Sequence, residues 1–345
     1  MKTDAEWMEL ALAEARKGIG RTAPNPPVGS VIVKDGQLLG RGYHHPAGRP
    51  LAEREALADA VARHGKDALK GSTAYVTLEP CSTHGRTPPC TEGLIEAGVK
   101  RVVYATVDRN PAHAGRADAI LHAAGIEVAS GTLKEEADVI LRPFFKVRET
   151  GLPWIIWKTA MSLDGRITRP PGEGQWLSGE DSRKDVQIIR SQVDAILTTG
   201  ETVRRDLPAL TIRIPELLEG RQQPWRVIFT DQASTLPADA PLLCDEWKDR
   251  TLIRTRHGIE LSLRNLVQDQ GVLSVMIEAG GKFSAAMLEA GMADEVAIYF
   301  APMLCGGPSL GLAGNGLTPS LKMKNISFEQ LGGDVKISAL IDRGV

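Results

Sequence analysis

The chain has 345 residues, of which 42% are hydrophobic and 24% are charged, and its formal net charge is −2. This composition is typical of a globular protein long enough for two domains, and it excludes a disordered or fibrous chain. No block of consecutive basic residues occurs, so we expect no nucleic-acid polymer as partner. An anionic substrate would have to be held by a few placed Arg and Lys side chains.

Cysteine number and the pattern of apolar residues bear on the cellular compartment of the protein. The four cysteines Cys81, Cys90, Cys244 and Cys305 are too few for a disulfide framework and predict a reducing, cytoplasmic environment. Residues 1–15 carry acidic side chains within their apolar periodicity, which predicts an amphipathic helix rather than a signal peptide. No run of about eighteen apolar residues occurs, so we expect no membrane span.

Helix and strand patterns alternate over residues 1–145. Asp35-Gly36 separates the apolar runs 28–33 and 38–39 and predicts a hairpin turn. This alternation predicts a sheet between layers of helices. Further helices are expected at 53–63, 89–97 and 117–123, and further strands at 74–78, 101–107 and 126–128.

A polar segment with Gly151 and Pro153, residues 148–153, predicts the boundary between a domain of residues 1–147 and one of residues 148–345. A second alternating pattern follows, without an internal repeat. It predicts strands at 154–160, 195–198, 226–229, 272–277 and 296–300, and helices at 182–190 and 283–290.

Two thiols are the informative feature of the first half. Glu79-Pro80-Cys81 ends a predicted strand, and Cys90 begins a predicted helix. A helix N-terminus favours thiolates, which are the form that binds zinc. The alternative is a pair of unrelated free cysteines.

Zinc deaminases combine His-x-Glu with Pro-Cys and a second Cys, with zinc activating water and the Glu shuttling protons. The runs PNPPVG (24–29), GYH (42–44), TLEPC (77–81) and GRTPPC (85–90) resemble the deaminase half of the bifunctional riboflavin-biosynthesis deaminase–reductases. The resemblance implies a cytidine-deaminase-like, three-layer α/β domain. It also implies zinc on Cys81 and Cys90, a proton shuttle at Glu53 and a substrate-positioning role for Asn25.

The sequence departs from that family at one ligand. The metal-binding His expected two residues before Glu53 is replaced by Leu51, which cannot ligate a metal. A catalytic zinc normally has three protein ligands and a water. We favour a metal-free, inactive deaminase half, with His84 as a loop side chain. The alternatives are an active enzyme in which Leu51 is an accidental or engineered change, or a substitute ligand from His44, His45 or Glu55.

The second half has no GxGxxG fingerprint. Instead, the run IEAGGKFS (277–284) leaves a strand and opens a helix, where glycines and free N–H groups can receive a phosphate. The alternative is a tight turn without a ligand. The runs KTAMSLDGR (158–166), TGETV (199–203) and DLPALTIR (206–213) resemble the reductase half of the same family, so the resemblance covers nearly the whole chain and implies a fold similar to dihydrofolate reductase.

The resemblance implies a reductase that uses NADPH to reduce the ribose of a phosphoribosyl-pyrimidine. Lys158 and Glu278 are candidates to polarise or protonate the sugar, and Arg190 and Arg213 can pair with its phosphate. Gly174 stands where the family commonly has a substrate-contacting Ser. The remaining expected substrate contacts are Leu210 and Glu278, and the expected cofactor contacts are Ala160, Trp176, Thr202, Asp206, Gly280, Gly281, Lys282, Phe283 and Ser284.

Without the resemblance, Arg190 could be a helix-surface residue and Trp176 a core residue. Lys282 and Ser284, or else Arg204 or Arg205, are compatible with the cofactor's 2′-phosphate. The leading hypothesis is a working reductase with an impaired deaminase; the alternatives are a fully bifunctional enzyme and a non-catalytic nucleotide-binding or regulatory protein. The family tendency implies a homo-oligomer.

Overall fold

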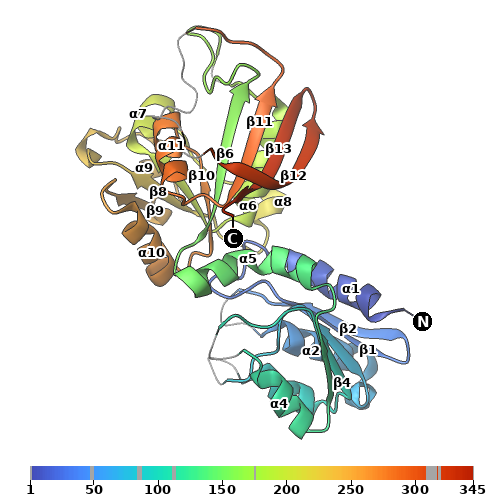
Figure 1. The fold of residues 1–345 in the computed structure, drawn as a ribbon. Helices are drawn as coiled ribbons and strands as arrows, with labels where there is room; N and C mark the ends of the chain where they lie inside the picture. Colours follow the sequence, from blue (N-terminus) through green and yellow to red (C-terminus); the bar gives the residue numbers. More distant parts are fainter. Residues whose placement is uncertain are drawn as a thin grey trace. The chain divides into compact units, whose positions relative to one another are not determined.

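The structure is a computed structural model that describes residues 2–46, 50–83, 88–110, 114–174, 176–307, 317 and 320–344. The chain forms two compact units, Met1–Leu152 and Pro153–Val345, each built on its own sheet (Figure 1). Among the described residues, no helix has both the length and the apolar character needed to cross a membrane.

The first unit contains a five-stranded sheet in the order β2-β1-β3-β4-β5. β1 runs antiparallel to β2 and β3, whereas β3, β4 and β5 are parallel. The predicted hairpin is confirmed: Asp35 and Gly36 both have positive φ, 50° and 73°, as a two-residue hairpin turn requires. The strands are β1 (Gly29–Lys34), β2 (Gln37–Tyr43), β3 (Thr73–Val76), β4 (Arg101–Tyr104) and β5 (Glu127–Ser130).

Helices cover both faces of this sheet, as expected for a three-layer domain (Figure 1). A core of Ile32, Leu57, Leu94 and Leu121 joins the sheet to one helix layer. On β2, a Cβ added at Gly40 would lie 2.3 Å from the carbonyl oxygen of Ala56, so the glycine allows the helix that carries Glu53 to pack closely. One layer contains α2 (Ala52–His64), α3 (Cys90–Glu96) and α4 (Arg116–Ala123), with the 3₁₀ turn η1 (Lys66–Leu69), and the other contains α1 (Asp4–Lys17) and α5 (Lys134–Thr150).

Helix α5 extends into the segment 148–153, where the domain boundary was predicted. Residues 148–150 form its last turn, and its C-cap Gly151 has φ 70°. The helix persists because Leu141, Phe144 and Phe145 form a buried stripe at helical spacing. The assignment of separate functions to residues 1–147 and 148–345 stays a prediction.

The second unit contains an eight-stranded sheet in the order β12-β13-β11-β6-β10-β7-β8-β9. The strands from β11 to β9 are parallel, and the hairpin β12–β13 joins β11 in antiparallel fashion. Strands β9, β12 and β13 were not predicted. The strands are β6 (Trp154–Ser162), β7 (Ala195–Thr199), β8 (Trp225–Phe229), β9 (Thr251–Arg254), β10 (Ser274–Ile277), β11 (Glu295–Ala301), β12 (Lys322–Leu331) and β13 (Asp334–Asp342).

Helix α6 packs on one face of this sheet through Val186 and Ile189, which join a core with Met276 and Tyr299. Asp334, from the hairpin β12–β13, accepts hydrogen bonds from the Gly179 amide at 2.7 Å and the Ser182 hydroxyl at 2.6 Å, so it satisfies donors at the N-terminus of α6. The helices are α6 (Glu180–Gln192), α7 (Gly200–Asp206), α8 (Pro215–Leu218), α9 (Pro241–Cys244), α10 (Ile259–Gln270) and α11 (Gly281–Glu289), with the 3₁₀ turns η2 (Ala233–Thr235) and η3 (Lys248–Arg250).

Candidate functional sites

Sheet register brings Lys158 and Glu278 together in the second unit. β6 and β10 are parallel, with Trp157 paired to Ile277. Directly paired residues of neighbouring strands point to the same face, so the next residues, Lys158 and Glu278, are neighbours. The Lys158 Nζ lies 3.5 Å from the Glu278 Oε2. Both side chains are mostly buried, with 17% and 12% of their surface exposed.

Arg190 completes this cluster from α6. Its Nε donates to the Glu278 Oε1 at 2.7 Å, and a terminal nitrogen donates to the Thr211 carbonyl at 2.9 Å. Arg190 is only 8% exposed, so the alternative that it is a helix-surface residue is wrong. Its amphipathic helix turns this face towards the sheet, because Val186 and Ile189 bury the same side of α6.

The charges around Glu278 fix its ionisation. Burial opposes the charged carboxylate, but Arg190 and Lys158 outweigh it and lower the pKa of Glu278 to about 2. The carboxylate is therefore ionised at neutral pH, and each of its oxygens faces a cation.

Arg213 lies on the loop next to Arg190. Its backbone amide donates to the Gln187 Oε1 at 2.7 Å. Partial burial and the nearby charge of Arg190 lower the pKa of the Arg213 guanidinium. Within the described ranges, no carboxylate lies within ion-pair distance of that guanidinium. The side chain of Leu210, expected to contact substrate, packs in the core of this unit, and its substrate contact stays a prediction.

The predicted glycine turn lies beside open space. Gly280 precedes α11, and a Cβ added to it would have no neighbour within 4 Å. Ser284 is buried and donates to the Ala279 carbonyl at 3.3 Å, and Phe283 packs on Phe229 with ring centroids 5.6 Å apart. These two side chains hold the turn, whereas Lys282 is exposed. The amides of Gly281 and its neighbours in the first turn can receive an anion.

Thr202 lies in a second strand–helix turn, after β7, which is the neighbour of β10. The Thr199 hydroxyl accepts from the Thr202 amide at 3.3 Å and caps α7. The two turns therefore lie at the carboxyl ends of adjacent parallel strands, where α/β sheets bind ligands. At the other end of α7, partial burial raises the pKa of Asp206.

The other predicted cofactor contacts fall on β6 and the loop after it. Ala160 follows Lys158 by two residues, on the same face of β6, and packs against the core that contains Met276. Trp176 is 53% exposed, with the Arg183 guanidinium 5.6 Å from its ring, so the alternative that it is a core residue is wrong. Gly174 has φ 95° and open space around it.

The candidates for a 2′-phosphate contact differ in their present partners. Arg204 donates to the Thr235 hydroxyl at 2.8 Å, and Arg205 lies 3.8 Å from the Asp206 carboxylate. Lys282 is exposed, and Ser284 donates its hydroxyl to a carbonyl. The contacts of these four side chains do not show which of them would bind the 2′-phosphate.

In the first unit, the two predicted thiols and Glu53 meet. The Cys90 amide donates to the Cys81 sulfur at 3.2 Å, and the Cys90 side chain contacts the Glu53 carboxylate. The hydrogen bond with Cys90 lowers the pKa of Cys81, and burial raises the pKa of Glu53. The structure therefore brings together three of the expected deaminase side chains.

The expected third zinc ligand is missing here. Leu51 is the N-cap residue of α2 and offers no donor atom. Among the described residues, no group of three His, Cys, Asp or Glu side chains is arranged to hold a metal ion. The described residues therefore do not supply the three ligands of a catalytic zinc. His84 lies outside the described residues.

The substitute ligands proposed for zinc have other surroundings. Burial lowers the pKa of His44, so its ring is neutral. From its hydrogen-bond partners we assign the ring proton to Nδ1, which donates to the Pro50 carbonyl at 3.3 Å. The Nε2 then accepts from the side-chain amide of Asn25 at 2.9 Å. The His45 ring packs on Tyr43, with centroids 4.3 Å apart. Glu55 also belongs to no metal-holding group in the described ranges.

Glu79 has a structural role that the sequence did not reveal. It is 3% exposed and accepts hydrogen bonds from the backbone amides of Asp108, Gly115 and Ala117 at 3.0 to 3.2 Å. It thus ties the segment after β4 to the strand end that leads to Cys81. The only sequence signal was its place in the TLEPC run.

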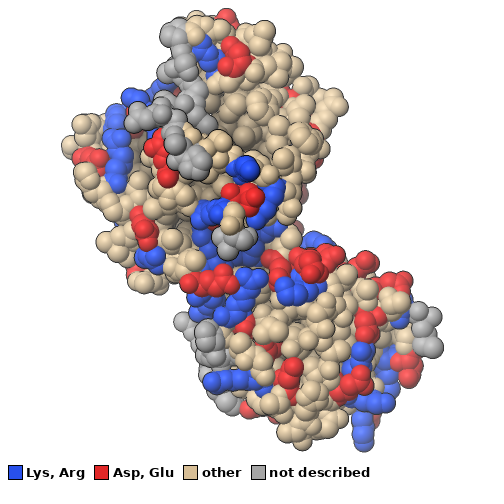
Figure 2. Space-filling model, in the orientation of Figure 1, with Lys and Arg blue, Asp and Glu red and all other residues tan. Residues whose placement is uncertain are grey.

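Charged side chains of both signs lie on the face shown in Figure 2, where Lys and Arg have Asp and Glu as neighbours and no continuous basic patch covers either unit. The absence of a nucleic-acid partner stays a prediction.

Two family models match the chain. Residues 1–106 match the cytidine and deoxycytidylate deaminase zinc-binding region. Residues 153–337 match the RibD C-terminal domain. Together the models cover both units, which confirms the predicted pairing of a deaminase-like with a reductase-like α/β domain.

Similar proteins cover the whole length of the chain. The riboflavin biosynthesis protein RibD of Escherichia coli is 42% identical over 336 residues, 90% of each chain. A solved structure of Acinetobacter baumannii RibD has a TM-score of 0.88 and 36% identity, covering 99% of both chains. A Thermotoga maritima structure described as a diaminohydroxyphosphoribosylaminopyrimidine deaminase/5-amino-6-(5-phosphoribosylamino)uracil reductase has a TM-score of 0.86 and 30% identity, covering 98% of this chain and 99% of that one.

Proposed function

The chain belongs to the RibD family of bifunctional deaminase–reductases of riboflavin biosynthesis, and from this premise we propose that its second unit uses NADPH to reduce the ribosyl group of 5-amino-6-(5-phosphoribosylamino)uracil. The observation that carries the proposal is the cluster of Lys158, Arg190 and Glu278, with Arg213 beside it, where the middle of β6 meets the carboxyl end of β10.

The cluster suits a sugar phosphate because its cations outnumber its carboxylate. Glu278 neutralises part of the charge of Lys158 and Arg190, while Arg213 has no carboxylate partner in the described part of the chain. A guanidinium can bind a phosphate through two parallel hydrogen bonds. We assign the phosphate to Arg213 with support from Arg190, whose Nε is already committed to Glu278.

The ionisation of Glu278 separates the roles of the two candidate proton donors. With a pKa of about 2, Glu278 carries no proton to donate at neutral pH. Lys158 carries N–H donors that can protonate the ring oxygen of the ribose as its bond to C1′ breaks, which leaves C1′ doubly bonded to the amino nitrogen and ready to accept hydride. Glu278 then holds the Lys158 ammonium in position. NADPH, when bound, supplies the hydride to C1′.

The proposed cofactor site lies along the carboxyl ends of β6, β7 and β10. The turn Gly280–Ser284 fits a phosphate because a backbone amide can be approached closely beside Gly280. We retain the residue assignments made from the sequence: Ala160, Trp176, Thr202, Asp206, Gly280, Gly281, Lys282, Phe283 and Ser284 for NADPH, and Gly174, Arg190, Leu210, Arg213 and Glu278 for substrate.

For the first unit we propose a deaminase-like site without tightly bound catalytic zinc. The support is Leu51 at the N-cap of α2 and the absence of a three-donor group among the residues described. Asn25, Glu53, Cys81 and Cys90 keep the positions in which substrate binding and proton transfer would be expected. We also retain the predictions of a cytoplasmic location and a homo-oligomer.

A direct absorbance assay tests the reductase. The purified chain is mixed with NADPH and 5-amino-6-(5-phosphoribosylamino)uracil, and NADPH oxidation is followed by absorbance. We expect turnover that falls by about 100-fold or more in Lys158→Met, but not in Lys184→Met, whose exposed ammonium pairs with Glu180. Binding of NADPH without oxidation would instead favour a non-catalytic nucleotide-binding protein.

Metal content and ammonia release test the deaminase unit. We expect substoichiometric zinc and negligible ammonia release from the diaminopyrimidine substrate. Leu51→His should raise both, because it adds an imidazole beside two thiols. Ala58→His, at an exposed position of the same helix, is a control that adds a histidine away from the thiols. Stoichiometric zinc with normal ammonia release in the unmodified chain would refute the proposal and point to a substitute ligand.

A further inference from the structure

The loop that carries Arg213 has a strained backbone. Leu207 and Leu210 have positive φ, 43° and 50°, a region that non-glycine residues adopt only when their surroundings enforce it. The same stretch supplies the Thr211 carbonyl that binds Arg190. Something in the fold must therefore hold residues 209–213 in place.

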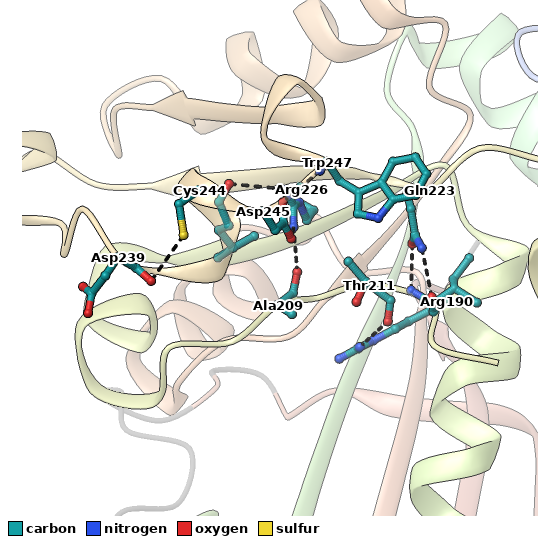
Figure 3. Close-up of polar contacts among 11 residues, drawn as sticks. Arg190, Ala209, Thr211, Gln223, Arg226, Asp239, Cys244, Asp245 and Trp247 are labelled. Atoms are coloured by element: carbon teal, nitrogen blue, oxygen red, sulfur yellow. Dashed lines mark hydrogen bonds and ion pairs between the residues drawn. The ribbon is translucent and has the colours of Figure 1, made fainter. Parts of the chain in front are cut away.

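Gln223 holds the middle of this loop. The Ile212 amide donates to the Gln223 Oε1 at 2.7 Å, and the Gln223 Nε2 donates back to the Ile212 carbonyl at 2.9 Å (Figure 3). Both residues are 2% exposed. The side-chain amide thus pairs with the loop backbone as a neighbouring strand would, and fixes both its position and the plane of its peptide groups.

A second anchor holds the start of the loop. Arg226 on β8 is fully buried and donates to the Ala209 carbonyl at 3.0 Å. The same guanidinium forms a bidentate pair with Asp245 at 2.6 and 2.7 Å (Figure 3). Because Arg226 is itself fixed, the loop is pinned on both sides of Leu210.

The pinned backbone connects Gln223 to the site. Thr211, the residue before Ile212, presents its carbonyl to Arg190 at 2.9 Å. Arg190 in turn binds Glu278 at 2.7 Å. Arg213, the residue after Ile212, is held by its amide on Gln187. A shift of Ile212 would therefore move the partner of Arg190 and the origin of the Arg213 side chain together.

We propose that Gln223 is a positioning residue of the reductase site: by fixing the Ile212 backbone, it orients Arg190 and Arg213 towards the substrate phosphate. This inference rests on the proposed reductase function. Gln223 touches neither Lys158 nor Glu278 through any bond recorded among the described residues, so its influence on the site runs through the loop backbone.

The chain offers a matched control for this residue. Gln223→Met keeps the length of the side chain and removes both hydrogen bonds. Gln222→Met makes the same change at the preceding, exposed position, where the amide oxygen accepts from Arg250 at 2.6 Å. We expect Gln223→Met to raise KM for the pyrimidine substrate by about tenfold or more and to leave KM for NADPH within about twofold. Gln222→Met should leave both constants unchanged.

A double-mutant cycle tests whether Gln223 acts through Arg190. If it does, Gln223→Met should weaken substrate binding much less when Arg190 is already replaced in Arg190→Lys than in the unmodified chain. Additive effects of the two substitutions on KM for the pyrimidine substrate would overturn the inference, as would equal effects of the Gln223 and Gln222 variants.

A measurement without turnover separates this inference from the proposed function. NMR hydrogen exchange follows the Ile212 amide and the Arg190 Nε proton directly. We expect both to exchange faster in Gln223→Met than in the unmodified chain and in Gln222→Met. If the unmodified chain does not reduce the substrate, the proposed function fails, and the exchange rates still decide the inference: unchanged Arg190 exchange overturns it.

Discussion

The pair of the fully buried Arg226 with the partly buried Asp245 is expected to make a large contribution to the stability of the second unit. The guanidinium has no exposed surface, and Asp245 accepts two of its hydrogen bonds, at 2.6 and 2.7 Å. Asp245→Ala would leave a buried cation whose remaining partners among the described residues are the Ala209 and Leu242 carbonyls. Such a loss destabilises proteins by about 3–5 kcal/mol.

That loss converts into a melting shift that is easily measured. In a domain of this size, 1 kcal/mol corresponds to about 2–4 °C, so the transition of the second unit should fall by about 6–20 °C. Trp247 donates its amide to Asp245 at 3.0 Å, so tryptophan fluorescence during heating follows the affected region. The bond to Arg226 lowers the pKa of Asp245. The stabilisation is therefore complete above the ordinary pKa of this carboxyl and is lost as the pH falls through the lowered value.

Two further variants give the prediction a reference. Glu260→Ala removes the exposed pair with Arg264 on α10, where the side chains are 52% and 38% exposed, and should cost about 0–1 kcal/mol. Replacing both partners, Arg226→Met with Asp245→Leu, should destabilise less than Asp245→Ala alone, because no charge is left unpaired. If Asp245→Ala melts within about 2 °C of Glu260→Ala, the reasoning about the buried cation is wrong.

Two other predictions concern the reductase site. Glu278→Gln should lower kcat/KM by about 10²- to 10⁴-fold, because Lys158 and Arg190 lose their shared carboxylate, and equal turnover by the variant would contradict this role. The pKa of Glu278 is lowered from 4.5 to about 2, so the stability that its ionised form contributes is complete above about pH 4.5 and is lost as the pH falls towards 2; urea denaturation should therefore show the deficit of Glu278→Gln shrinking over that range. Gly280→Ala should raise KM for NADPH by about tenfold or more with little change in melting temperature, because the added Cβ meets open space in the fold and would occupy the room of a phosphate; an unchanged KM would place the cofactor elsewhere.

The strands of the reductase site could be predicted because apolar runs mark them directly. The residues 154–160 and 272–277 were predicted as strands, and the structure places β6 and β10 there. Parallel pairing of those strands then brings Lys158 next to Glu278. The deaminase thiols could be placed in the same way, because a strand end and a helix start are both visible in the local pattern.

The parts that were missed depend on contacts between distant residues. Alternation in β12 is weak because most of its side chains, including Phe328, are exposed, so a hydrophobic pattern gives no signal for the final hairpin. The two bonds between Gln223 and Ile212 involve the backbone of a loop, which leaves no trace in residue types. A fully buried arginine such as Arg226 also contradicts the ordinary expectation for a charged side chain.

The bonds from Asp334 to the start of α6 bear on the order in which the two units can fold during synthesis. Gly179 and Asp334 are 155 residues apart in the chain, and Lys158 and Glu278 are 120 residues apart. The first unit is complete once residue 152 has left the ribosome. The bonds that satisfy the start of the helix that carries Arg190 form only after residue 334 has emerged. A nascent chain therefore passes through a long period with a folded first unit and an open second sheet, and this is when its exposed strands most need protection from aggregation.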